Sequence, residues 1–195
     1  KVEGFCNLAA VEGFTYCWID TCSIDKSSSA ELSEAINSMF SYYQDSDACY
    51  VYLDVKIQGD RVTLTELRNT RWITRGWTLQ ELIAPSNVSF FDKKWKLCGT
   101  RSELVIELHS ITGIGLEPLS GVDLTMLQNY SIATKMSWAS KRITTRPEDL
   151  AYCLFGIFQV HLPPLYGEGR LAAFRRLQEE IIKYSLDLSF LAWTA

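Results

Sequence analysis

The first half of the chain alternates between short apolar runs and longer stretches in which apolar residues recur at a helical period. Three of the runs are followed by turn residues, as buried strands are, and they cover residues 16–20, 49–55 and 88–91. The helical stretches cover residues 1–11, 28–43 and 72–83. Ser28 and Glu31 have the spacing of a capping box at the start of the second stretch. This alternation predicts an α/β fold with a partly parallel sheet flanked by helices.

Beyond Trp95 the pattern becomes mainly helical. The helices are expected at residues 101–110, 129–139, 147–158 and 169–184. Thr145 and Glu148 form a second pair with capping-box spacing, while loops are expected at 58–61 and 113–121. The final apolar run, 188–193, fits a sheet-edge strand, although a helix is also consistent with it. The pattern therefore predicts one domain over residues 1–195, with an α/β half (1–95) and a mainly helical half (96–195).

Acidic residues stand at the C-terminal ends of the three predicted strands, at Asp20, Asp54 and Asp92. In parallel sheets, ligands bind beyond the carboxyl ends of the strands. The first of these ends also carries Cys22 and Asp25, so two carboxylates and a thiol could face one ligand. The commoner role of such residues is to cap a turn or to face solvent, and Cys22 has no histidine nearby in sequence to act as its base.

Trp77 and Glu81 lie four residues apart on a predicted helix and so share one face. An aromatic plane beside a carboxylate can stack a nicotinamide or adenine ring and stabilise the oxocarbenium-like centre formed when an N-glycosidic bond breaks. The alternative is that Trp77 belongs to the core and Glu81 pairs with an arginine. Gly167 and Gly169, before the last predicted helix, could offer backbone N–H groups to a phosphate, although glycine often precedes a helix for conformational reasons alone.

Composition narrows the partners and the compartment. With 47% hydrophobic residues and a net charge of −4, the chain can bury a core and has no bulk positive field for nucleic acid or an anionic membrane. The six cysteines are expected to be free thiols, mostly buried, in a reducing compartment, and the cytoplasm is predicted. The absence of a C-x-x-C pair and the presence of only two histidines argue against a metal site, and no apolar run is long enough to span a bilayer.

Several motifs together resemble the fungal heterokaryon-incompatibility (HET) domain. They cover nearly the whole chain and lie at residues 18–26, 75–85, 131–158, 166–169 and 176–181. The resemblance implies a domain that provokes programmed cell death in fungal non-self recognition, a form of innate immunity, and that is joined to nucleotide-binding or repeat domains. The family's opening strand normally precedes the helix with which this chain begins, so the chain is expected to start inside a larger domain.

The stretch from Trp77 to Leu82 is also distantly similar to a helix of TIR signalling domains. This likeness implies a TIR-like sheet and NAD as a substrate rather than a bound cofactor. Glu81 would then be the catalytic residue of a NAD glycohydrolase, with Trp77 stacking on the substrate, and Asp20, Cys22 and Asp25 would line the same crevice. The competing hypothesis is a non-enzymatic interaction module that kills by forming homo-oligomers and recruiting partners.

Overall fold

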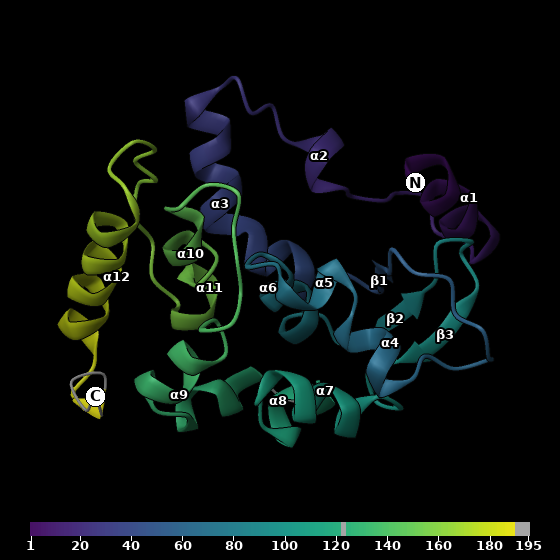
Figure 1. Cartoon of the computed structure of the whole chain (residues 1–195). Helices are drawn as coiled ribbons and strands as arrows, with labels where there is room; N and C mark the ends of the chain where they lie inside the picture. The colour runs from purple at the N-terminus through teal and green to yellow at the C-terminus, as the bar shows by residue number, and fades with distance from the viewer. Residues whose placement is uncertain (122–123, 190–195) are drawn as a thin grey trace.

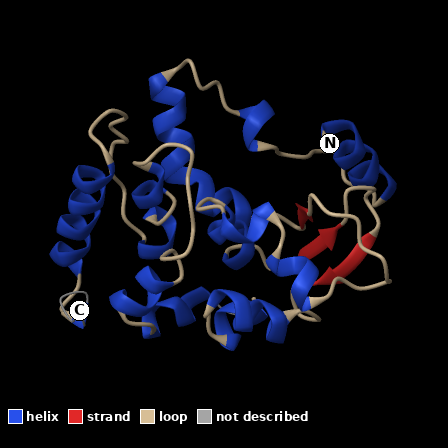
Figure 2. Ribbon diagram, in the orientation of Figure 1, coloured by secondary structure: helices blue, strands red, loops and turns tan. Residues whose placement is uncertain are grey.

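The computed structural model describes residues 1–121 and 124–189, which form an α/β fold with a small mixed sheet (Figures 1 and 2). The sheet contains β1 (Cys49–Tyr52), β2 (Val88–Phe91) and β3 (Leu97–Thr100) in that order. β1 and β2 are parallel, with Cys49 opposite Val88, and β3 returns antiparallel to β2. The predicted α/β class and the partly parallel sheet are confirmed, whereas β3 was not predicted.

Helices supply most of the remaining structure. They are α1 (Val2–Val11), α2 (Asp20–Ser23), α3 (Ser29–Gln44), α4 (Leu64–Arg68), α5 (Arg71–Thr74), α6 (Thr78–Ile83), α7 (Val105–Thr112), α8 (Leu116–Ser120), the 3₁₀ helix η1 (Leu124–Asn129), α9 (Ile132–Ser137), α10 (Asp149–Tyr152), α11 (Phe155–Phe158) and α12 (Arg170–Tyr184). The helices expected at 1–11, 28–43 and 169–184 are confirmed as α1, α3 and α12. At the start of α3 the Ser28 Oγ accepts a hydrogen bond from the Glu31 N–H at 3.3 Å, but the Glu31 carboxylate turns to the Asp25 N–H instead. Half of the predicted capping box therefore forms.

The predicted strand at 16–20 is wrong. Residues 16–19 are not in any strand, and Asp20 opens the short helix α2. Trp18 packs against Tyr42 and Tyr43 of α3, with ring centroids 5.5 and 5.6 Å apart. An apolar run can be buried against a helix as well as within a sheet, so its composition alone does not distinguish the two.

The single helix expected at 72–83 is also wrong, because a turn at Gly76 divides it into α5 and α6. The Gly76 N–H donates to the Ile143 carbonyl at 2.9 Å, and the Ile143 N–H donates to the Thr74 carbonyl at 2.7 Å. The Arg142 guanidinium holds the same turn by donating to the Arg75 carbonyl and to the Thr78 Oγ1, both at 2.8 Å. Contacts from the distant 142–143 segment therefore replace local helical hydrogen bonds.

In the C-terminal half, several predicted boundaries move. The helix expected at 101–110 begins later, as α7, and α8 lies within the expected loop at 113–121. The helix expected at 147–158 divides into α10 and α11, and Glu148 rather than Thr145 is the N-cap of α10. The strand expected at 188–193 lies mostly outside the described residues.

One hydrophobic cluster joins both halves of the chain. Fully buried side chains reach it from the sheet, α6, α10 and α12, including Phe90, Leu82, Tyr152 and Leu177. The opposite face of the sheet carries Tyr50 and Trp95, and α1 lies beside this face (Figure 1). Phe5 of α1 meets Tyr50 edge-on at 5.6 Å. Among the described residues, no helix is both long and apolar enough to cross a membrane.

Candidate functional site

A cleft of about 620 Å³ lies between α1, the extended segment 14–19, the end of α3 and the start of β1. Its walls are largely aromatic, with contributions from Phe5, Phe14, Tyr16, Trp18, Tyr42, Tyr43, Tyr50 and Trp95. Charged side chains also line it, among them Asp20, Arg75 and Glu81. The cleft therefore combines apolar planes with a few polar groups, as small-molecule sites do.

Glu81 projects from the first turn of α6 and is half-buried. The Trp72 Nε1–H donates to the Glu81 Oε2 at 2.7 Å. Burial raises the pKa of Glu81 above its ordinary value, while the Trp72 hydrogen bond acts in the opposite direction because it favours the carboxylate. Nearby charges act as smaller causes, with Asp20 raising this pKa and Arg75 lowering it.

Tyr43, near the end of α3, faces the same carboxylate. Burial raises the pKa of Tyr43 well above its ordinary value, and the charge of Glu81 and a hydrogen bond to it add to the effect. The phenol therefore stays protonated across the physiological range. The Trp72 N–H donates to Glu81, and Tyr43 lies near enough for the Glu81 charge to raise its pKa.

The predicted site residues divide into two groups. Asp20 and Glu81 both line the cleft, as expected for residues facing one ligand. Trp77, Cys22 and Asp25 are not among the described residues that line it. Trp77 packs with Tyr43 and Trp18 against a small cluster of Ile24, Ala35 and Met39. Asp25 accepts hydrogen bonds from Ser27 that lower the pKa of its carboxyl.

Trp72 was missed by the sequence analysis for a geometric reason. In an uninterrupted α-helix, positions nine apart lie about half a turn from each other, so Trp72 and Glu81 would point in opposite directions. The Gly76 turn reorients α6 relative to α5 and brings the two side chains together. A glycine inside a predicted helix was the available signal.

The carboxyl ends of the strands do not form the site. The Asp54 Oδ1 accepts from the Arg71 N–H at 3.2 Å, and the buried Asp92 Oδ1 accepts from the N–H groups of Lys94 and Lys96 at 2.8 and 3.0 Å. Asp54 is thus hydrogen-bonded to the start of α5 and Asp92 to its own turn, and the cleft lies instead beside the amino end of β1, at residues 45–50. The expected crevice forms where the connections after neighbouring parallel strands run to opposite sides of a sheet. The described sheet has one parallel pair, β1 and β2, and therefore has no such crevice.

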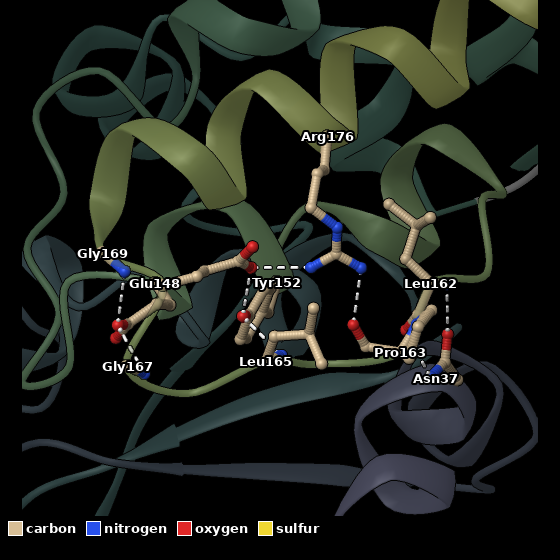
Figure 3. Close-up of polar contacts among 10 residues, drawn as sticks. Asn37, Glu148, Tyr152, Leu162, Pro163, Leu165, Gly167, Gly169 and Arg176 are labelled. Atoms are coloured by element: carbon tan, nitrogen blue, oxygen red, sulfur yellow. Dashed lines mark hydrogen bonds and ion pairs between the residues drawn. The ribbon is translucent and has the colours of Figure 1, made fainter.

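The glycine pair before α12 does not offer free amides to a phosphate. The N–H groups of Gly167 and Gly169 both donate to the Glu148 Oε1 at 3.0 Å (Figure 3). In the same segment the Glu168 Oε1 accepts from the Tyr152 hydroxyl at 2.8 Å and from Arg176 at 2.6 Å. An internal carboxylate thus occupies the place of the anion, and the segment ties α10 to α12.

The described site residues include no metal-binding group, and the cysteines divide evenly between buried and exposed positions. The described residues contain no group of three or more His, Cys, Asp or Glu side chains arranged to hold a metal ion. Cys49, Cys98 and Cys153 are buried, whereas Cys6, Cys17 and Cys22 are exposed, so the expectation of mostly buried cysteines holds for half of them. The exposed three all lie in or beside the segments that build the cleft.

Fold and cleft together define an α/β protein with a hydrogen-bonded carboxylate in an aromatic-walled cleft. No family model and no solved structure matches the chain. The chain is similar to the vegetative incompatibility protein HET-E-1 of Podospora anserina, with 49% identity over 189 residues. The match covers 94% of this chain but 14% of HET-E-1, so the chain spans a small part of the length of that relative. The chain is therefore related to a protein of fungal incompatibility.

Proposed function

We propose that this chain is a cell-death effector domain of fungal heterokaryon incompatibility, acting in the cytoplasm by hydrolysing NAD in the cleft around Glu81. The role in non-self recognition is carried by the 49% identity to a vegetative incompatibility protein over 94% of the chain. Because the match covers 14% of that relative, we further propose that other domains, of the nucleotide-binding or repeat kind, control this one.

The proposed reaction breaks the bond between the nicotinamide nitrogen and the ribose carbon of NAD. The bond's electron pair leaves with nicotinamide, water adds its oxygen to the ribosyl cation, and a proton passes to solvent, giving ADP-ribose and nicotinamide. Glu81 stabilises the ribosyl cation by its negative charge, which acts strongly in a partly desolvated wall. In this proposal Asp20, which lines the same cleft, accepts hydrogen bonds from ribose hydroxyls or from the attacking water.

The chemistry of the walls supports this substrate class. A cationic nicotinamide ring is attracted by the faces of aromatic rings and by carboxylates, and Trp18, Tyr43 and Glu81 supply both in one cleft. Arg75 is exposed at the same cleft and can meet a phosphate of the dinucleotide. In this proposal Trp18, which lines the cleft, contacts the ring in place of Trp77, while the TIR-like mechanism itself is retained.

The test measures NAD consumption and the nicotinamide released by the purified full-length chain. The assay is run at several protein concentrations, with and without an agent that crosslinks or clusters the protein. Glu81→Gln keeps the shape of the side chain and removes its charge, so we expect turnover to fall by at least about 100-fold. Glu179→Gln is the matched control, because Glu179 is exposed on α12, far from the cleft-lining residues. Equal turnover in wild type and Glu81→Gln would remove Glu81 from the reaction.

A second candidate is killing by oligomerisation without catalysis. It is favoured by apolar side chains exposed on and just beyond α12, where Leu171, Tyr184 and Leu186 are 82%, 81% and 99% exposed. If this candidate is correct, cell killing survives Glu81→Gln and is lost on Leu171→Asp or Tyr184→Asp. Viability of cells expressing each variant, at matched protein levels, separates the two candidates.

A further inference from the structure

Two exposed thiols meet where α1 joins the wall of the cleft. Cys6 lies on α1 and Cys17 lies in the extended segment that leads to Asp20. Their Sγ atoms are 3.6 Å apart although the residues are eleven positions apart in the chain. Both side chains are exposed, and Cys17 also lines the cleft.

The surroundings allow these thiols to join. A disulfide requires an S–S separation of about 2 Å, so the sulfurs must approach by roughly 1.5 Å. Small rotations of two exposed side chains and a slight shift of α1 can supply this movement. Ala9 is the buried residue of α1, and the helix is held mainly by Phe5 against the aromatic face of the sheet and by the Tyr50 hydroxyl, which donates to Glu12.

We propose that Cys6 and Cys17 form a reversible disulfide that fastens α1 to the 14–19 wall of the cleft. The oxidant is a small disulfide such as oxidised glutathione. One protein thiolate attacks a glutathione sulfur, the glutathione S–S bond breaks, and a glutathione thiolate leaves with its electron pair. The second protein thiolate then attacks the mixed disulfide and releases the second glutathione. The two protein thiols lose two electrons and two protons, and one glutathione disulfide becomes two glutathione thiols.

The bond would act on the geometry of the cleft. Phe5 belongs to one wall and Asp20 follows directly on the other, so a covalent link between these walls limits how far the cleft can open. The bond forms when the ratio of oxidised to reduced glutathione rises and is broken again when that ratio falls. An effect of the disulfide on turnover rests on the proposed function, whereas formation of the disulfide does not.

The purified full-length chain is equilibrated with defined ratios of oxidised and reduced glutathione. The remaining free thiols are then blocked, and the linked cysteines are identified by mass spectrometry. Trypsin is unsuitable because residues 2–25 contain no Lys or Arg. Cleavage after Glu3, Glu12 and Asp20 instead releases the three exposed cysteines on separate peptides. We expect a linked pair of peptides 4–12 and 13–20 in wild type and in Cys22→Ser, and its loss in Cys6→Ser.

Hydrogen exchange gives a second, independent measurement. Oxidation should slow amide exchange in α1 by at least about tenfold in wild type and in Cys22→Ser, and should leave Cys6→Ser unchanged. A dominant Cys17–Cys22 or Cys6–Cys22 link, or glutathione adducts without an internal link, would overturn the proposal. A Cys6–Cys17 link in a chain that does not consume NAD would leave the disulfide standing and contradict the proposed function alone.

Discussion

The hydrogen bond from Trp72 to Glu81 can be tested by replacing Trp72 with Phe. The substitution keeps an aromatic ring against Phe90, which Trp72 meets edge-on at 5.4 Å, and removes the Nε1–H donor that lies 2.7 Å from the Glu81 Oε2. Hydrogen bonds to charged groups contribute about 1.5–3 kcal/mol. Because Glu81 is half-buried and partly solvated, we take the lower end of this range.

A loss of about 1.4 kcal/mol changes an ionisation equilibrium roughly tenfold. The Trp72 N–H stabilises the carboxylate, so its removal favours protonated Glu81 and raises the pKa of Glu81 further. Wild type and Trp72→Phe should therefore differ in the pH at which Glu81 ionises, with the variant requiring higher pH. The Glu81 carboxyl carbon, followed by ¹³C NMR during a pH titration, reports this directly, and the acid side of the NAD-consumption profile should shift in the same direction.

Trp138→Phe is the matched control. Trp138 is also buried, at 2% exposure, and its Nε1 has no hydrogen-bond partner among the described residues. This control makes a buried ring smaller without touching Glu81, so the space that it leaves should lower stability by of order 1 kcal/mol and the Glu81 titration should stay unchanged. An identical Glu81 titration in wild type and Trp72→Phe, with Trp138→Phe behaving the same, would refute the assigned hydrogen bond.

Three further predictions concern stability. Glu81→Gln should unfold at a higher temperature than wild type, by a margin that grows as pH rises above the ordinary carboxyl pKa. A carboxyl whose folded pKa is raised stabilises the fold at low pH and loses that contribution as pH rises through the folded pKa. A margin that stays constant with pH in thermal melts would contradict this. Gly76→Ala should cost about 1–3 kcal/mol in urea unfolding, since its Cβ would lie 2.5 Å from the Thr144 Cγ2 and 3.2 Å from the Cys153 Sγ. Glu148→Gln should flatten the loss of stability in acid, because backbone hydrogen bonds lower the pKa of Glu148 and its contribution is present above about pH 5 and lost as pH falls; equally steep acid unfolding in both proteins would argue against it.

The local pattern of apolar and polar residues was sufficient to predict the elements that bury one clear apolar face. The α3 and α12 helices carry clear apolar stripes and lie where the periodicity predicts them, and β2 matches its predicted bounds. In each case burial of one face decides the conformation, and that face is visible in the order of residues. Glu81 was singled out because it lies four residues after Trp77 and because the stretch from Trp77 to Leu82 is similar to a helix of TIR domains.

Tertiary contacts decided the remainder. Whether the run at 16–20 paired in a sheet depended on whether a neighbouring strand or the aromatic side chains of α3 were nearer, which composition does not record. The Gly76 turn depends on Arg142 and Ile143, more than sixty residues away in the chain. Only after that turn forms do Trp72 and Glu81 meet, and only after α1 packs on the sheet do Cys6 and Cys17 approach. The sequence by itself determined the α/β class and pointed to Glu81 as the candidate carboxylate. Long-range packing determined which side chains contact one another, such as Trp72 with Glu81 and Cys6 with Cys17.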